Sequence, residues 1–424
     1  MGAMARPELD ASIPVVLIWP SIGVMRSLGR LGVPVFCVDP DGRSAATVSR
    51  YCRETFSWDL RVAEPERSVA FLGCIAERIG GKPILLAADD VGAIFVAEHS
   101  AELGAWYRMR HPSAGVARAL SNKERMFHLC NEHGVPTPRA LFPKTRDEVE
   151  ALLGAIEFPI LLKGIDTQLQ ERRTRRRMTL VRSRDELLAA YDALEDPRDP
   201  NLMLQEYIPG GAESVWMFNG YFDRESQCVI GYTGRKLRQW PVGTGATSLG
   251  VCVRNEEVET LVTRFMRELG YRGPLDLGLR YDTRDGQYKL LDVNPRIGAT
   301  FRLFVGENDL DVVRALHLDL SGRPVPTAAA RDGTKWVDEY ADLASSYCHV
   351  RNRELTLTGW FRSFRGVEER QWLARDDLAP FAAMGLKFGR KVLRRSTGSS
   401  HPVRLHPGAG TAAAAEAPTS TVPG

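Results

Sequence analysis

The chain has 424 residues, a length that is too great for one compact domain and that favours about two to four. Hydrophobic residues make up 44% of it and charged residues 26%, which supplies apolar material for buried cores and excludes a wholly disordered protein. The net charge is only +3, so the total gives no reason to expect a nucleic-acid or membrane partner.

The seven cysteines are spread singly along the chain, with no CxxC pair. A zinc site or a disulfide framework needs clustered spacing, so we expect free thiols in a reducing compartment. The chain opens with no secretory signal pattern and contains no run of about 20 apolar residues. We therefore expect a cytoplasmic protein, and we interpret residues 1–12 as a flexible start that carries a cloning remnant.

Apolar strand patterns alternate with helical patterns in the first part of the chain. The strand patterns cover 13–19, 33–38 and 83–88, and a helical pattern covers 24–31. This alternation predicts a parallel sheet with helices on both faces, and Asp89 and Asp90 follow a strand, where open α/β sheets bind ligands. No GxGxxG follows the first strand and no GxxxxGKS/T occurs, so neither a dinucleotide site nor a P-loop is predicted. We assign 13–120 to this α/β domain.

A second region begins near Ser121, which stands three residues before Glu124 as in a capping box and predicts a helix that ends at Gly134. A compact α+β pattern follows, and we assign 121–210 to it. Its strands are predicted at 159–163 and 202–207, and its helices begin at Thr145 and Ser183. The remaining assignments are a longer α+β region at 211–323, a C-terminal extension at 324–395, and a disordered tail at 396–424 that is rich in small residues and proline.

The clearest chemical motif is the strand end Leu290 to Arg296. Asp292 and Asn294 share one face of that strand because side chains repeat every two residues. Two hard oxygen ligands there suit Mg²⁺ held with a nucleotide phosphate, and Arg296 can address a phosphoryl or carboxylate oxygen in the same cleft. Taken alone, the pattern is more simply a strand end with solvated polar residues.

Three further features favour the nucleotide interpretation. Lys163 ends an apolar strand and precedes Gly164, so its point charge can reach a phosphate across the next loop. The segment 202–210 resembles a hinge strand whose backbone pairs with an adenine edge, with Glu213 beyond it to accept from ribose hydroxyls. Lys123 begins a helix that precedes both.

In this order, the residues resemble the ATP-grasp superfamily of ATP-dependent carboxylate–amine ligases, over roughly 120–320. The resemblance implies a mixed α/β and α+β protein: an ATP-grasp fold with an N-terminal, Rossmann-like pre-ATP-grasp domain. It also implies the roles of single residues. Lys123 and Lys163 would bind ATP phosphates, and Asp292 and Asn294 would bind Mg²⁺ or, as an alternative, Mn²⁺. The adenine would be framed by Gln205, Glu206, Tyr207 and Ile208, and Glu213 would hold the ribose. Arg296 would stabilise the acyl phosphate.

The implied reaction joins a carboxylate to an amine on an amino acid or small peptide. One anion must attack another, so cations and metal have to neutralise the triphosphate, and a closing middle domain has to exclude water from the acyl phosphate. Carboxylation or carboxylate phosphorylation is a second outcome in the superfamily, although no biotin-carrier motif is present. A degenerate member that binds nucleotide without turnover is the rival class.

The sequence departs from the family pattern at two places. The strand before the metal motif usually carries a further metal ligand, but that position is Gly278, so we expect Asp276 on the same face to substitute directly or through water. The loop after Lys163 is usually short and rich in Gly and Ser, whereas 172–177 holds five arginines. These arginines either clasp a triphosphate or anionic substrate, or belong to a solvated loop.

Substrate selection is expected at 234–245, where Lys236 and Arg238 alternate on one predicted strand face and suit an α-carboxylate. Exposed strand cations are the simpler alternative. The aromatic residues Trp216, Phe218, Phe301 and Phe304 are expected in the core.

A basic amphipathic helix is predicted near 381–395, with an apolar stripe of Phe381, Met384, Phe388 and Val392. Packing against the protein's own body is favoured over peripheral membrane contact. The oligomeric state stays open and is compatible with a homodimer.

Overall fold

The computed structural model describes residues 7–175 and 177–397. The first part of the chain forms a parallel sheet in the order β3-β2-β1-β4, which confirms the predicted α/β architecture. Its strands are β1 (Val15–Ile18), β2 (Val35–Asp39), β3 (Cys52–Ser57) and β4 (Ile84–Ala87), and its helices are α1 (Ile22–Gly29), α2 (Pro65–Ile79), α3 (Asp90–Glu98) and α4 (Ser100–Leu103). We call this part the front domain.

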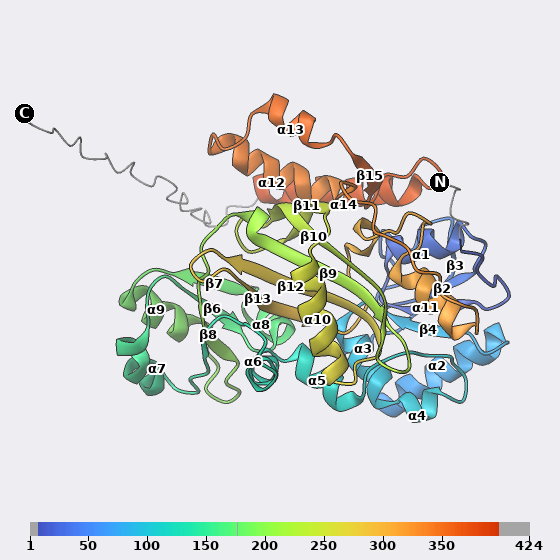
Figure 1. The fold of residues 1–424 in the computed structure, drawn as a ribbon, viewed down its shortest axis with the longest axis horizontal. Coiled ribbons are helices and arrows are strands. Elements are labelled where there is room, and N and C mark those ends of the chain that lie inside the picture. The colour runs from blue at the N-terminus through green and yellow to red at the C-terminus, as the bar shows by residue number, and fades with distance from the viewer. Residues whose placement is uncertain (1–6, 176, 398–424) are drawn as a thin grey trace, which may run out of the picture.

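Two helices lead from the front domain to a small antiparallel sheet, which lies at the opposite end of the molecule (Figure 1). They are α5 (Ala114–Ser121) and α6 (Lys123–Glu132). The small sheet has the order β5-β8-β6-β7, with β5 (Ala140–Leu141), β6 (Ile160–Gly164), β7 (Met178–Val181) and β8 (Leu202–Glu206). The helices α7 (Arg146–Leu152) and α9 (Arg184–Leu194) and the 3₁₀ turn η1 (Leu153–Ala155) complete this part, which we call the lid.

The lid has its own apolar core, made by side chains such as Val149, Leu162, Leu187 and Tyr191. The front domain, in contrast, shares one continuous core with the large sheet, in which Val15 and Leu28 belong to the same cluster as Tyr221. A part whose core is separate can move as a unit at a lower cost than a part whose core is shared.

The centre of the molecule is a seven-stranded sheet in the order β13-β12-β9-β10-β11-β14-β15. Its strands are β9 (Val215–Phe222), β10 (Cys228–Trp240), β11 (Ala246–Cys252), β12 (Gly273–Asp282), β13 (Gln287–Asn294), β14 (Lys335–Val337) and β15 (Val367–Arg370). On one face, Phe218, Leu277 and Val293 pack with Phe265 of α10 (Glu256–Glu268). The residues that alternate with them point to the other face, and at β12 and β13 they are mainly polar. At β9 this face carries Asn219, whereas Met217 and Tyr221 join the core shared with the front domain.

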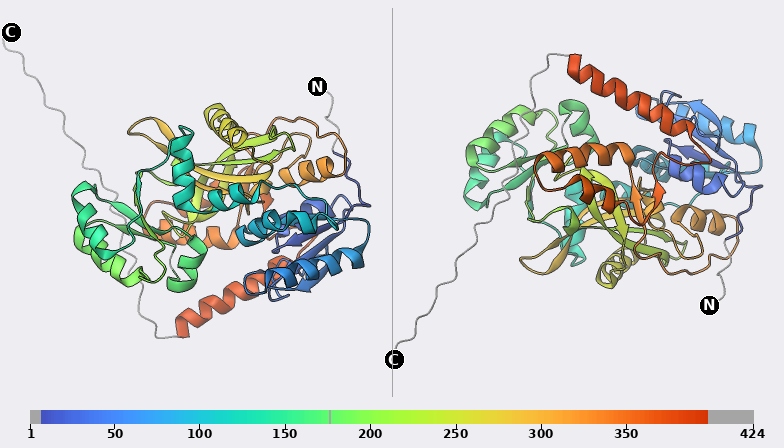
Figure 2. Two further views of the ribbon diagram at one scale, coloured as in Figure 1. Left: turned by 90° about the horizontal axis from the view of Figure 1, so that it is seen from below. Right: turned by 90° about the horizontal axis from the view of Figure 1, so that it is seen from above.

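The C-terminal segment completes this sheet instead of forming a separate layer. Its strands β14 and β15 extend the sheet beyond β11, so the sheet continues across residue 323, where the sequence suggests a boundary. The other elements after β13 are η3 (Phe301–Leu303), α11 (Val312–Leu320), α12 (Glu339–Arg351), α13 (Leu357–Ser363) and α14 (Ala379–Thr397). Figure 2 shows α14 beginning beside the front domain and running toward the lid end.

The helix α14 confirms the predicted helix and packs on the protein itself. Phe381 and Phe388 lie against the ring of Tyr340, with ring centroids 5.5 and 5.4 Å away. Tyr340 Oη also donates to the carbonyl of Phe381 at 2.9 Å. The favoured interpretation, docking on the protein's own body, therefore holds for the first half of the helix. The side chain of Val392 and the predicted tail from 398 lie outside the described residues.

Two local predictions are wrong. The cap of the α6 helix is Asn122, whose side chain accepts from Arg125 N at 3.0 Å, because the preceding helix α5 already includes Ser121. The segment after Lys163 is not a loop throughout: α8 (Thr167–Thr174) forms there and includes the first two arginines, capped by Asp166, which accepts from Leu169 N at 2.9 Å.

The cysteines and the core aromatics agree with the sequence interpretation. All seven cysteines are free thiols, and Phe218, Phe301 and Phe304 are fully buried. Trp216 is half-buried and packs edge-on against Tyr288. Across 7–175 and 177–397, no helix combines the length and the apolar character that crossing a bilayer requires.

Candidate functional site

The polar face of the large sheet brings three side chains into one row across neighbouring strands. Asp276 of β12 stands in register with Asn219 of β9 on one side and with Asn294 of β13 on the other. Its two carboxylate oxygens accept from Asn219 Nδ2 at 3.5 Å and from Asn294 Nδ2 at 3.2 Å. The sequence indicated Asp276 and Asn294, but Asn219 becomes visible only from the strand register.

These residues fit a divalent cation. Asn219 Oδ1 is buried and has no hydrogen-bond partner within the described structure, which is costly unless a cation or donor occupies the position. Nowhere in the described residues do three or more His, Cys, Asp or Glu side chains gather around one point, so a cation here would need the amide oxygens as well. Carboxylate and amide oxygens are the ligands that Mg²⁺ accepts.

Asp292 lies next to this row, one step along β13. It is in register with Gly278, so the position where the family carries a further ligand offers no side chain. Lys123 Nζ donates to Asp292 Oδ1 at 2.7 Å, and the carboxylate side chain is half-exposed to solvent. Burial opposes ionisation of Asp292, but the ammonium groups of Lys123 and Lys163 outweigh it and lower its pKa.

The charges of both predicted phosphate lysines act on that carboxylate. Lys123 is the first residue of α6, and Lys163 is the last but one of β6 in the lid. Lys163 is buried and donates to Gln205 Oε1 at 2.8 Å. Burial lowers the pKa of Lys163 to about 7, with a further reduction from the charge of Lys123. An anion placed between the lysines would restore the charge of Lys163.

The strand predicted to frame an adenine is the central strand β8 of the lid. Gln205 and Ile208 are buried and Tyr207 is half-buried beside the guanidinium of Arg280. The side chain of Glu206 is already engaged, because it accepts from Arg284 at 2.6 Å and from Arg139 N at 3.0 Å. Any contact that Glu206 makes to a base would therefore come from its backbone.

Glu213 lies just beyond this strand, in η2 (Ala212–Ser214), and its side chain is exposed. Its charge acts on Arg280, whose guanidinium also donates to the carbonyl of Gly210. The assignments of the adenine and ribose residues stay predictions.

Arg296 joins the large sheet to the front domain. Its Nε donates to Asp90 Oδ1 at 2.7 Å, and another guanidinium nitrogen donates to Asn294 Oδ1 at 3.1 Å. Asp90 is the first residue of α3, directly after β4, so it stands at the carboxyl edge of the front sheet. The sequence placed acidic residues at that edge but did not connect them with Arg296.

The structure separates the two predicted substrate cations. The β10–β11 ladder shifts by one residue between Lys236 and Arg238, so the alternation that would put them on one face is broken. Lys236 reaches the carbonyl of Gly245 at 2.8 Å, and the charges of Asp276 and Asp292 act on it. Burial nevertheless lowers the pKa of Lys236 to about 8.

Arg238 turns to the opposite side of the sheet. It makes two bonds to the buried carboxylate of Asp342 on α12, at 2.7 and 2.9 Å, and a third to Ser363 Oγ at 2.9 Å. These contacts hold the C-terminal helices on the sheet. The expectation that Arg238 shares a face with Lys236 is therefore wrong, and its guanidinium is occupied by a structural ion pair.

The arginines of 172–177 that the structure describes also divide between different partners. Arg173 pairs with Asp199, and Arg177 pairs with Glu171 at 2.8 Å, so both are held by carboxylates of the lid. Arg172 acts instead on the carboxylate of Asp59 in the front domain. Arg176 lies outside the described residues.

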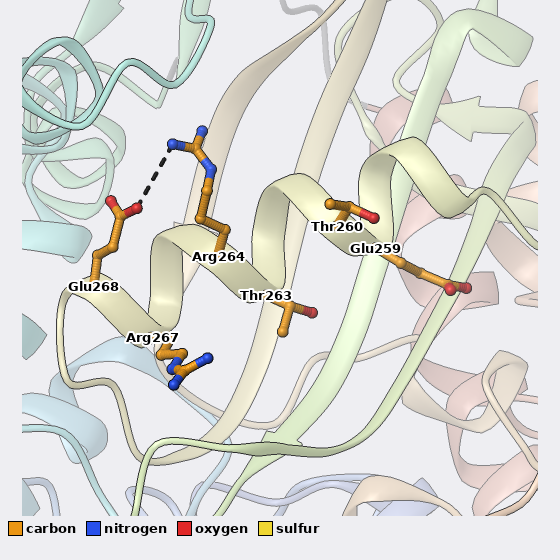
Figure 3. Close-up of a pocket in the computed structure, with 6 residues that line it drawn as sticks. All are labelled: Glu259, Thr260, Thr263, Arg264, Arg267 and Glu268. Atoms are coloured by element: carbon orange, nitrogen blue, oxygen red, sulfur yellow. Dashed lines mark ion pairs between the residues drawn. The ribbon is translucent and has the colours of Figure 1, made fainter.

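A surface hollow on α10 is not this site (Figure 3). Its six lining residues all belong to that one helix, and Arg264 and Glu268 form an ion pair across 3.6 Å. The helix packs on the apolar face of the large sheet, whereas Asp276 and Asp292 stand on the other face. The chemically equipped site is the group of side chains on the polar strands β12 and β13 together with Lys123, Lys163 of the lid and Asp90 of the front domain.

The known proteins that this chain resembles include two ligases and a carboxylase. No family model matches the chain. A D-aspartate ligase from Enterococcus faecium (strain Aus0004) is 25% identical over 247 residues, which cover 56% of this chain and 58% of the ligase. The match thus spans less than two thirds of that ligase's length.

Solved structures share the fold. An L-amino acid ligase from Bacillus licheniformis is 14% identical with a TM-score of 0.57, over 74% of this chain and 75% of the ligase. The biotin carboxylase domain of a Hydrogenobacter thermophilus 2-oxoglutarate carboxylase, in complex with MgADP, ADP and bicarbonate, is 16% identical with a TM-score of 0.58, over 76% and 73% of the two chains. The chain therefore has the ATP-grasp fold, as the resemblance noted in the sequence implies.

Proposed function

We propose that this protein is an ATP- and Mg²⁺-dependent ligase that activates a carboxylate as an acyl phosphate and joins it to an amine. The observation that carries the proposal is the arrangement of charge at one place in an ATP-grasp fold. Lys123 contacts Asp292, the charge of Lys163 acts on the same carboxylate, and the oxygen ligands of Asp276 and Asn294 lie on the same sheet face. The MgADP complex of a structural neighbour supports this choice of nucleotide and metal.

The residues of the candidate site have distinct roles in this proposal. Asp276, Asp292, Asn294 and Asn219 would hold Mg²⁺, which would neutralise the triphosphate when bound. Lys123 and Lys163 add positive charge beside the phosphates, so that a carboxylate can approach the γ-phosphorus. Lys236 faces the same carboxylates and supplies a cation for the substrate.

The reaction then has two balanced steps. The substrate carboxylate attacks the γ-phosphorus and ADP leaves, which forms the acyl phosphate. The amine attacks its carbonyl carbon, phosphate leaves, and an amide remains after the amine nitrogen loses a proton. Arg296 supports the negative charge that develops on the oxygens, and the lid excludes water that would hydrolyse the intermediate.

The proposed substrates are amino acids or small peptides. The names of the two ligases similar to this chain support amino-acid substrates. Seven free thiols favour a reducing compartment, and we therefore place the protein in the cytoplasm. Mn²⁺ as an alternative metal and a homodimeric state stay predictions.

A nucleotide-binding protein without turnover is the second candidate. The observation in its favour is Gly278, which leaves no side chain opposite Asp292. Asn219 weakens this case, because its unpartnered Oδ1 supplies another ligand to the same row.

A screen of amino-acid pairs for phosphate release from ATP tests the proposal, with the product mass measured for every active pair. We expect release that requires both substrates and Mg²⁺, with a product mass equal to the two substrates less water. Tight ATP binding without phosphate release for any pair would favour the second candidate. Release with bicarbonate in place of the carboxylate substrate would instead indicate carboxylation.

A further inference from the structure

Asp90 contacts two different parts of the molecule with its two carboxylate oxygens. Oδ1 accepts from Arg296 Nε at 2.7 Å, and Oδ2 accepts from Gln168 Nε2 at 3.3 Å. Asp90 begins α3 of the front domain, Arg296 follows β13 of the large sheet, and Gln168 lies in the first turn of α8. One carboxylate therefore connects three parts that are far apart in the sequence.

The contact with Asp90 completes the orientation of Arg296. The guanidinium also donates to Asn294 Oδ1 and to the carbonyl of Ile297, both at 3.1 Å, and it is 17% exposed. A guanidinium donates in one plane, so bonds from Nε and from both terminal nitrogens determine its orientation. Without Asp90, the Nε edge loses its partner and the enclosed cation loses the opposite charge that it contacts, while the charges of Asp276 and Asp292 still act on it.

The helix α8 presents one side to the front domain. Gln168 and Arg172 are four residues apart and therefore share a helix face. Gln168 contacts Asp90, and the charge of Arg172 acts on Asp59, which also follows a strand of the front sheet. Figure 1 shows α8 at the centre of the molecule, between the lid sheet and α3.

The helix also follows directly from the strand that carries Lys163. Only two residues, Ile165 and Asp166, separate the end of β6 from α8, so the helix and the phosphate lysine move together with the lid. The separate apolar core of the lid makes such a movement possible.

We propose that Asp90 is a positioning residue that couples closure of the lid helix α8 to the orientation of Arg296. With the lid closed, Gln168 occupies Oδ2 and holds the carboxylate in the rotamer that receives Arg296 on Oδ1. With the lid open, Asp90 loses that support and Arg296 is less well ordered. The cation that serves the acyl phosphate is thus in place only when water is excluded. The catalytic part of this inference rests on the proposed ligase function.

Kinetics of Asp90→Asn and Gln168→Ala test the catalytic part. We expect kcat for phosphate release to fall by about 10- to 100-fold in Asp90→Asn and by less in Gln168→Ala. The KM for ATP should change by less than about threefold, because a misplaced group lowers the rate without removing the nucleotide contacts. Asp90→Glu should recover part of the loss. In combination with Arg296→Lys, Asp90→Asn should add little further loss, since it acts through Arg296.

Two matched controls remove carboxylates from the same two helices without touching the junction. Glu171→Gln breaks the pair with Arg177 on α8, and Glu98→Gln breaks the pair with Arg118 at the other end of α3. Both should keep kcat. Unchanged kcat in Asp90→Asn, or losses that multiply with those of Arg296→Lys, would overturn the proposal.

Hydrogen–deuterium exchange of 167–174 tests the coupling without any ligation. Asp90→Ala should increase exchange in this helix several-fold while the melting temperature and the exchange of α9 stay unchanged. The Gln168→Glu variant, which places a second carboxylate beside Asp90, should have the same effect. Unaltered exchange in both variants would refute the coupling of α8 to Asp90 even if the protein is an active ligase. If no substrate pair releases phosphate but exchange increases, the ligase function fails and the coupling stands.

Discussion

At the scale of single residues, the ion pair between Lys123 and Asp292 links the two charges that a metal–triphosphate complex would separate. Each group is a partner for something else: the ammonium for a phosphate, the carboxylate for a cation. Their 2.7 Å contact means that binding of the complex has to replace one strong bond with two.

The variant Asp292→Asn should therefore separate nucleotide binding from metal dependence. We expect Mg²⁺-dependent phosphate release to fall below detection, because one anionic ligand is lost. Metal-free ATP should bind equally well or more tightly, because Lys123 is released and a charge that repels the triphosphate is gone. Calorimetric titration with and without Mg²⁺ measures both effects.

Asp285→Asn is the matched control, since it removes a carboxylate that pairs with Lys289 at 2.9 Å on the same β12–β13 hairpin. It should leave both measurements unchanged. Full activity of Asp292→Asn would contradict the metal assignment.

Lys163 gives a pH-dependent signature. Burial lowers its pKa to about 7 from 10.5, so at pH 8 the side chain is mostly neutral, and a bound triphosphate should restore its proton. We expect ATP binding at pH 8 to take up a proton, approaching one per nucleotide, and affinity to weaken as the pH rises through 7. Titration in two buffers of different ionisation enthalpy measures the uptake, and Lys163→Met should remove most of it.

The same group affects folding. Between about pH 7 and 10.5 the unfolded chain binds a proton that the folded chain does not, so this lysine makes stability rise with pH over that window. Denaturation of Lys163→Met should show a smaller rise over the same range. An identical pH slope in both proteins would rule out the lowered pKa.

At the scale of elements, the helix α14 offers a matched pair of glycines. Gly389 has open space where a Cβ would stand, whereas a Cβ on Gly385 would lie 2.8 Å from Tyr340 Oη. Gly389→Ala should stabilise the helix by up to about 1 kcal/mol, because alanine is the better helix former. Gly385→Ala should gain less or lose stability, because the Tyr340 hydroxyl has to shift. Exchange rates within 379–390 measure the difference, and equal gains in both variants would argue against the Tyr340 contact.

The helices and strands also show which local sequence signals were sufficient to predict them. Strands with strong apolar runs, such as β1, β4 and β6, lie within one or two residues of their predicted ranges. The signals failed where two helices adjoin at Ser121 and where the charged segment of α8 has no apolar periodicity. In α8, the Asp166 cap and the packing of Gln170 stabilise a helix that hydrophobic spacing does not indicate.

At the scale of the whole molecule, the C-terminal segment fastens the front domain to the large sheet. Asp377 accepts from Arg26 Nε at 2.9 Å, from Ser49 Oγ at 2.7 Å and from Arg50 N at 3.0 Å, and its contact with Arg26 is buried. The strand β15, which precedes Asp377 in the chain, belongs to the large sheet, so this cluster joins the large sheet to the front domain.

Asp377→Ala should cost about 3–5 kcal/mol of unfolding free energy, because it leaves the Arg26 cation buried with carbonyl partners but without its opposite charge. Its neighbour Asp376 is the control, since it pairs with Arg30 at 2.9 Å while half-exposed, and such pairs contribute about 0–1 kcal/mol. Urea denaturation of both alanine variants measures the difference. Similar losses in the two variants would contradict the proposed role of the buried pair.

Taken alone, the sequence determined the strand pattern of the front domain, the ordered set of lysines, carboxylates and amides, and through them the resemblance to the ATP-grasp superfamily. These features follow from local periodicity and residue order. Strand register and packing between distant segments decided the rest: Asn219 beside Asp276, Asp90 against Arg296 and Gln168, and Arg238 turned away by a one-residue bulge. These contacts join residues 57, 78 and 206 positions apart, so they depend on how whole elements pack, and no local pattern carries that information.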